Sequence, residues 1–296
     1  MKTIALLFSI FLLTVSASYG QQRYHSIHTD SIVIALWKQT TPFAQHPGAE
    51  KYLPGKRDHI KRLTNVTNPT ITIYGNDLSD KNAPARPAVI ICPGGGYSIL
   101  AVNLEGTEIA SWLSSLGFRP VLLKYRVPHN RKGAFADAQR AISILRFRAA
   151  KFHINPNKIG IIGFSAGGNL AARLSTHFTH RIYKPVDQAD TSSMRPDFGI
   201  LIYPAYLVNK QDELAKNVRV NKDTPPMFLV QTQDDPIGYR NSLFFYNALT
   251  RHHIPAELNM FAHGGHGYGL RIKKSNPLSA WNKRCARWLH SIGMQP

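Results

Sequence analysis

Residues 159–168 constrain the fold of this chain more than any other segment, because they combine a strand, a sharp turn and a helix start. Their sequence, Ile-Gly-Ile-Ile-Gly-Phe-Ser-Ala-Gly-Gly, leads into the helix-forming run 169–172. A G-x-S-x-G turn between a buried strand and a helix holds its serine, here Ser165, exposed at the top of a sheet. Gly163 and Gly167 lack side chains, so the turn can close against its neighbours. The following helix directs unpaired N–H groups and its positive dipole end towards an anion formed at the serine, as acyl transfer requires.

Apolar runs of strand length alternate with amphipathic helices through most of the chain. The predicted strands are 70–74, 88–92, 120–125, 158–163, 198–203, 227–232 and 256–261. Helices are predicted over 105–116, closed by Gly117, over 135–152, stopped by Asn155-Pro156, over 239–252 and over 278–292. This alternation predicts an α/β fold with a mostly parallel central sheet, helices on both faces and the serine turn after a central strand.

The amino-terminal residues have the features of a secretion signal. Residues 1–20 contain Lys2, an apolar stretch and the small-residue ending Ser18-Tyr19-Gly20. The apolar stretch is too short to span a membrane, and no cysteine follows it for lipid attachment. We therefore expect a cleaved signal peptide and a secreted or periplasmic protein. Residues 21–68, rich in prolines and charges, are interpreted as an N-terminal extension packed on a single catalytic domain over 69–296.

The chain is strongly basic, with 36 Lys and Arg against 17 Asp and Glu. Removal of residues 1–20 removes only Lys2 among the charged residues, so the net charge falls from +19 to +18. Such a charge attracts polyanions, and either a generally basic surface or attraction to acidic glycans explains it. No motif typical of specific nucleic-acid binding is present.

Cysteine and histidine spacing indicates neither a disulfide framework nor a metal site. Cys92 and Cys285 are the two cysteines, and we expect both to be buried free thiols. Pairs such as His177-x-x-His180 and His252-His253 lack the helical H-E-x-x-H pattern of catalytic zinc sites. We expect no metal and no cofactor.

A nucleophilic serine needs a histidine base and an acid that orients the histidine. Strand 227–232 leads into Asp234-Asp235-Pro236, and strand 256–261 leads into a loop with His263 and His266. The order Ser…Asp…His is the one that this turn requires. We assign Asp235 as the acid because it lies further from the strand end, and His266 as the base because flanking glycines let its loop reach back.

Backbone N–H groups must stabilise the oxyanion that the serine reaction forms. The N–H of Ala166 is one predicted donor, and the loop Pro93-Gly94-Gly95-Gly96-Tyr97 after strand 88–92 provides the second. Tyr97, Tyr203, Tyr206 and Tyr268 fall at strand ends or in loops beside this site. Their rings are either sugar-stacking surfaces or core residues with a hydroxyl at the surface; we assign Tyr97, Tyr206 and Tyr268 as candidate substrate contacts.

With these residues assembled, the chain resembles the α/β-hydrolase superfamily, and within it the secreted bacterial acetylxylan and feruloyl esterases. The resemblance covers residues 64–270 and rests on the glycine loop, the serine turn and the two motifs that supply the acid and the histidine. It implies Ser165, Asp235 and His266 as the catalytic residues and Gly95, Gly96 and Ala166 as oxyanion donors. Pro93 departs from the wider pattern, in which histidine often precedes the glycines, so other contacts must hold this loop.

We therefore predict a serine esterase that removes short acyl groups, most simply acetyl, from an acylated carbohydrate such as xylan. A feruloyl esterase and a short-chain carboxylesterase or lipase are alternatives, although residues 176–196, interpreted as an excursion over the site, are too polar for a lipase lid. A serine peptidase would need a further gating domain. A non-catalytic glycan-binding protein would leave the ordered Ser, Asp and His motifs without a role.

Overall fold

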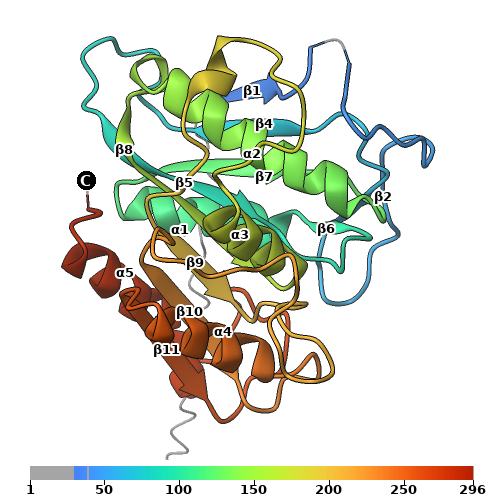
Figure 1. The fold of residues 1–296 in the computed structure, drawn as a ribbon, viewed down its shortest axis with the longest axis vertical. Helices are drawn as coiled ribbons and strands as arrows, with labels where there is room; N and C mark the ends of the chain where they lie inside the picture. Colours follow the sequence, from blue (N-terminus) through green and yellow to red (C-terminus); the bar gives the residue numbers. More distant parts are fainter. Residues whose placement is uncertain (1–29, 39, 296) are drawn as a thin grey trace, which may run out of the picture.

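The computed structural model describes residues 30–38 and 40–295, so the predicted signal peptide lies outside the described part of the chain. Across these residues, eight strands form one twisted sheet in the order β1-β4-β7-β5-β8-β9-β10-β11 (Figure 1). The strands are β1 (Ser31–Ala35), β4 (Thr70–Tyr74), β5 (Arg86–Cys92), β7 (Arg119–Lys124), β8 (Ile154–Phe164), β9 (Gly199–Ile202), β10 (Met227–Thr232) and β11 (Ala256–Phe261). The run from β7 to β11 is parallel, and β4 and β1 are added in antiparallel fashion at one edge.

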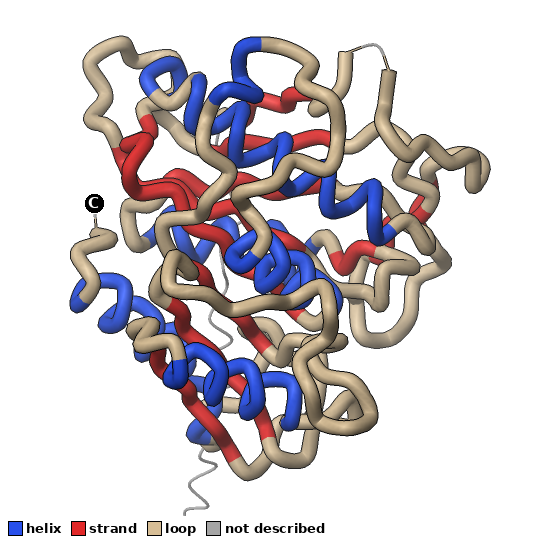
Figure 2. Tube along the Cα trace, viewed as in Figure 1, coloured by secondary structure: helices blue, strands red, loops and turns tan. Residues whose placement is uncertain are grey.

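Helices cover both faces of this sheet (Figures 1 and 2). The helices are α1 (Glu108–Ser115), α2 (Arg131–Phe147), α3 (Ala166–Thr176), α4 (Arg240–Arg251) and α5 (Trp281–Ser291). One buried cluster joins the sheet to α2, α3 and α4, and a second joins its other face to α1 and α5. The α/β arrangement predicted from the sequence is confirmed.

The two cysteines lie in these two different clusters, Cys92 in the first and Cys285 in the second. Both are buried and unbridged, as expected. Burial raises the pKa of both thiols, because the thiolate would lose its hydration in these apolar surroundings.

The register of the central strands brings the functional loops together. Cys92 at the end of β5 is paired with Gly163 near the end of β8, and Gly163 is paired with Leu201 of β9. The carboxyl ends of parallel strands meet at one edge of a sheet, which is where open α/β sheets place their sites. The glycine loop after β5 and the serine turn after β8 are therefore neighbours.

Several predicted element boundaries are wrong. The helix predicted to stop at Asn155-Pro156 ends at Phe147, and both residues lie inside β8, where β5 pairs with Ile154. The helix predicted from Glu105 begins at Glu108, after a π-helical turn over Asn103–Thr107 that buries Glu105. The last helix begins at Trp281, after a 3₁₀ turn over Pro277–Ala280.

Two segments take positions that the sequence pattern does not predict. A small second sheet is formed by β2 (Lys51–Tyr52), β3 (Arg62–Thr64) and β6 (Leu100–Ala101). Residues 176–196, expected over the site, lie along α2 instead, where Asp187 and Asp190 form ion pairs with the buried Arg140.

Further 3₁₀ turns lie at Ala150–Phe152 and Gln188–Thr191. Among the described residues, none of the helices has the length and apolarity needed to cross a bilayer.

Candidate active site

Ser165 occupies a tight turn between β8 and α3. Its backbone has φ 51° and ψ −116°, a conformation that residues other than glycine rarely adopt. The turn is fixed on both sides: the Ser165 N–H donates to the Ile202 carbonyl (3.1 Å), and the Ser165 carbonyl accepts from the Ala205 N–H (3.0 Å).

The glycines that flank the turn are required by close backbone contacts. A Cβ on Gly163 would lie 2.1 Å from the Gly167 carbonyl oxygen, and a Cβ on Gly167 would lie 2.0 Å from the Cys92 carbonyl oxygen. No side chain fits at either position without displacing backbone. The second contact also shows how closely the serine turn packs against the end of β5.

The structure joins Ser165, His266 and Asp235 in one hydrogen-bonded chain. His266 Nε2 lies 2.8 Å from Ser165 Oγ, and His266 Nδ1 lies 2.9 Å from Asp235 Oδ2. Asp235 is buried, and it also accepts from the Ile237 N–H (2.8 Å) and from Gln231 Nε2 (2.8 Å). Because the carboxylate accepts a hydrogen bond from Nδ1–H, Nε2 is left as the acceptor for the serine hydroxyl.

Asp234 and His263, which were not assigned to the catalytic chain, lie outside it. Asp234 accepts the N–H groups of Gly265 (2.8 Å) and Gly264 (3.0 Å), and these bonds lower the pKa of its carboxyl. It therefore holds the loop that carries His266. His263 is exposed, with Nδ1 3.5 Å from Asp234 Oδ2.

The predicted oxyanion donors are open for a ligand. Within the described part of the chain, no protein acceptor takes the N–H of Gly95, Gly96 or Ala166. The departure at Pro93 is compensated by other contacts, since the Pro93 carbonyl accepts from the Tyr125 hydroxyl (2.6 Å).

A buried acid that the sequence interpretation missed links the two sides of the site. Glu105, 4% exposed, accepts the Gly94 N–H at 2.6 Å and the Tyr203 hydroxyl at 2.8 Å. Tyr203 in turn accepts the Gly269 N–H (3.0 Å), and its ring packs edge-on against His266 at 4.8 Å between centroids. Burial raises the pKa of Glu105, and the hydrogen bonds from Tyr203 and Gly94 oppose the rise. Helical periodicity gave no signal for this role, because a π-helical turn sets the direction of the side chain.

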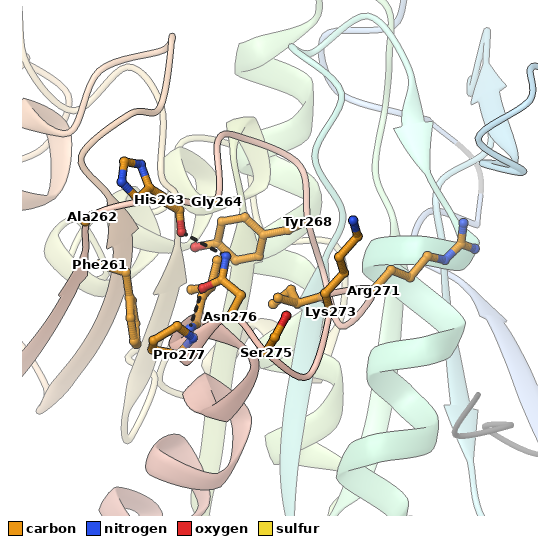
Figure 3. Close-up of a pocket in the computed structure, with 12 residues that line it drawn as sticks. Phe261, Ala262, His263, Gly264, Tyr268, Arg271, Lys273, Ser275, Asn276 and Pro277 are labelled. Carbon is orange, nitrogen blue, oxygen red and sulfur yellow. Dashed lines mark hydrogen bonds between the residues drawn. The ribbon is translucent and has the colours of Figure 1, made fainter. Parts of the chain in front are cut away.

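Of the three tyrosines assigned as substrate contacts, only Tyr206 presents a ring to solvent. Tyr97 is 1% exposed and donates to Asn169 Oδ1 at 2.8 Å, whereas Tyr206 is 40% exposed. Tyr268 is 8% exposed and lines a cavity of about 530 Å³ with Phe261 and Leu278 (Figure 3). Neither Ser165 nor His266 lines that cavity, so it lies beside the histidine loop and not at the serine.

Comparisons with known proteins were consistent with each other. Residues 73–202 match the family model BD-FAE. The chain is 29% identical over 213 residues to an acetylxylan esterase from Xylanibacter ruminicola and 31% identical over 225 residues to endo-1,4-beta-xylanase B from Butyrivibrio fibrisolvens. These matches cover 63% and 67% of this chain but 42% and 34% of the relatives, so the chain spans less than half the length of each.

Among solved structures, the chain is similar to an acetyl ester-xyloside bifunctional hydrolase from Caldicellulosiruptor lactoaceticus. The two are 32% identical with a TM-score of 0.74, and the match covers 90% of this chain and 97% of the other. An α/β hydrolase from a Medee basin deep-sea metagenome library is 28% identical, with a TM-score of 0.64 over 82% of this chain and 97% of the other.

Proposed function

Since this chain belongs to the α/β-hydrolase esterases, and its residues 73–202 match the BD-FAE model, we propose that it hydrolyses carboxylic esters of a carbohydrate. Within that class, we assign the removal of short acyl groups, in the first place acetyl, from a polysaccharide such as xylan. The names of the similar proteins, an acetylxylan esterase and an acetyl ester-xyloside hydrolase, support this substrate class.

One observation carries the proposal: a continuous Asp235–His266–Ser165 hydrogen-bond chain lies beside unoccupied backbone donors. In the proposed mechanism, Ser165 Oγ attacks the ester carbonyl carbon while His266 Nε2 takes the hydroxyl proton. The Asp235 carboxylate stabilises the imidazolium that forms. The oxyanion of the tetrahedral intermediate accepts hydrogen bonds from Ala166 and from Gly95 or Gly96.

The intermediate collapses when His266 returns the proton to the leaving sugar oxygen, which releases the alcohol and leaves an ester on Ser165. Water then attacks the carbonyl carbon of this acyl-enzyme while His266 accepts its proton. His266 returns that proton to the departing Ser165 Oγ, so the carboxylic acid is released and the free serine is regenerated. Every group in both half-reactions belongs to this chain or to water, so the proposed mechanism needs no metal or cofactor.

We further propose that residues 1–20 direct export and are removed, since a polymer substrate such as xylan is outside the cell. Amino-terminal sequencing of protein recovered from the periplasm or medium tests this step. A mature terminus at Gln21 supports it, and an intact Met1 in the cytoplasmic fraction contradicts it.

Acetate release from acetylated xylan tests the substrate class. It should be measured beside 4-nitrophenyl acetate, butyrate and longer esters and methyl ferulate, with Ser165→Ala as the control. We expect acetate release from the polymer and a steep preference for acetyl among the small esters. The Ser165→Ala variant should lose activity on the polymer and on the small esters. Turnover of methyl ferulate without acetate release would replace the acetyl assignment, and activity surviving in Ser165→Ala would contradict the mechanism.

A further inference from the structure

Arg131, at the start of α2, lies against two tyrosine rings. Its guanidinium carbon is 4.3 Å from the ring centroid of Tyr206 and 4.9 Å from that of Tyr97. The side chain is exposed, and among the described residues no carboxylate or carbonyl accepts a hydrogen bond from its guanidinium. By contrast, Arg126 and Arg140 on either side of it are buried and paired with Asp137 and Asp187. Arg131 is thus a positive group held in place by stacking, with its N–H edges free.

Both rings belong to segments that form the candidate active site. Tyr97 directly follows Gly96, a predicted oxyanion donor, and Tyr206 follows Ala205, whose N–H is bound by the Ser165 carbonyl at 3.0 Å. The Tyr206 hydroxyl lies 3.8 Å from the position that a Cβ on Gly96 would take. Arg131 therefore lies at the rim of the site, next to the oxyanion loop.

Asn169 holds both the Tyr97 ring and the Tyr206 backbone by hydrogen bonds. The Tyr97 hydroxyl donates to Asn169 Oδ1 (2.8 Å), and Asn169 Nδ2 donates to the Tyr206 carbonyl (3.0 Å). Tyr97 and Tyr206 have φ values of 59° and 58°, in the left-handed region that residues other than glycine rarely adopt. Backbone in this region clusters at functional sites, where surrounding contacts hold it in place. The guanidinium therefore lies against one buried ring and one exposed ring whose backbone is held in place.

We propose that Arg131 and Tyr206 form a carboxylate subsite, which binds a carboxylate that the substrate carries close to its scissile ester. The planar guanidinium matches a carboxylate in a bidentate geometry, and a sugar ring that bears the acid would lie over the exposed face of Tyr206. The inference rests on the proposed esterase function and narrows its substrate class to esters that also carry a carboxylate. The carboxylate belongs either to a uronic acid residue of the saccharide or to a dicarboxylic acyl group.

Two matched substrate pairs distinguish these sources. The first pair is acetylated xylo-oligosaccharides with and without a glucuronic acid branch, and their hydrolysis is measured as acetate release. The second is monoethyl succinate and the neutral ethyl valerate, followed by titration of released acid. For each pair, the readout is the ratio of kcat/KM on the anionic substrate to kcat/KM on the neutral one.

We expect one of the two ratios to be about 10 or more in the wild-type enzyme, as a hydrogen bond to a charged group contributes. The ratio should fall towards 1 in Arg131→Gln and remain intermediate in Arg131→Lys. The control is Lys132→Gln, which removes the same charge from the next residue; Lys132 lies over the Phe43 ring at 4.3 Å. This control should keep both the ratio and the activity on neutral esters.

The outcomes distinguish failure of the carboxylate subsite from failure of the proposed esterase activity. Wild-type ratios near 1 in both pairs, with normal turnover of the neutral esters, overturn the carboxylate subsite and leave the esterase assignment standing. A ratio that survives in Arg131→Gln, or that is also lost in Lys132→Gln, overturns the role of Arg131. No turnover of any of the four substrates overturns the proposed function, and the subsite with it.

Discussion

Replacing the buried Glu105 tests whether the oxyanion loop is positioned by this side chain. Glu105 accepts the Gly94 N–H and the Tyr203 hydroxyl, and Gly94 directly precedes the two glycines that are predicted to bind the oxyanion. In Glu105→Gln, the amide oxygen can still accept from Gly94, but the NH₂ group then meets the hydroxyl of Tyr203. That hydroxyl already accepts from Gly269, so its own proton loses its acceptor.

The magnitude follows from these contacts. A buried donor left without an acceptor costs about 1–3 kcal/mol, so the lost partner of the Tyr203 hydroxyl should lower the free energy of unfolding by about 2 kcal/mol. Removing an oxyanion donor lowers kcat by about 10²–10³, and displacing the loop should lower it by about 10². The loss should appear in kcat with little change in KM, because the loop acts on the transition state more than on ground-state binding.

The assay is the hydrolysis of 4-nitrophenyl acetate. Urea unfolding is measured first, so that the assay temperature is one at which each variant is folded. Glu108→Gln is the matched control: Glu108 lies three residues later and pairs with Arg271 at the surface, where an ion pair contributes less than about 1 kcal/mol. It should keep kcat within about twofold. If Glu105→Gln is also within about twofold of wild type while folded, the positioning role is refuted.

Three further predictions concern other parts of the site and fold. Asp235→Asn should lower kcat by about 10⁴, whereas Asp234→Asn should lower it less than about 10-fold, as steady-state kinetics would show; equal losses would contradict the assignment. Gly167→Ala should lower the free energy of unfolding in urea by about 3 kcal/mol because its Cβ meets backbone, and a stable, active variant would contradict the turn geometry. Hydrogen bonding from Arg140 lowers the pKa of Asp187 to about 2, so its stabilisation is present above about pH 4 and declines as the pH falls towards 2. Asp187 is 30% exposed, so we expect Asp187→Asn to cost about 1 kcal/mol in urea unfolding at pH 6 and less at pH 3; an equal cost at both would contradict this.

Local pattern predicted the parts of the fold whose residues decide their own conformation. The strands 70–74, 227–232 and 256–261 were predicted with the bounds that the structure has, because each is a short apolar or alternating run bounded by turn residues. The choice of Asp235 and His266 was also possible from sequence, since their positions after β10 and β11 bring them to the same sheet edge as Ser165. The structure places these three side chains within hydrogen-bond distance, while their catalytic roles remain a proposal.

The features that were missed depend on contacts between distant residues. Nothing local indicates that Asn155-Pro156 lie in a strand, because the pairing of Ile154 with Arg86 of β5 decides it. Residues 176–196 are polar, but their acids lie against the buried Arg140 and not over the serine. Glu105 was predicted only as the first residue of a helix, whereas it lies in the π-helical turn over Asn103–Thr107 and is buried.

The central claim is that Ser165 is the nucleophile of an acyl-transfer reaction, activated by His266. The most direct measurement is the intact mass of the protein after reaction with a fluorophosphonate, in which the serine oxygen displaces fluoride and forms a stable ester, followed by peptide mapping. The account predicts one adduct, on the peptide that contains Ser165, no adduct in Ser165→Ala, and labelling slowed by about 10³-fold or more in His266→Ala. An unlabelled wild-type protein, or an adduct on another residue, would contradict it.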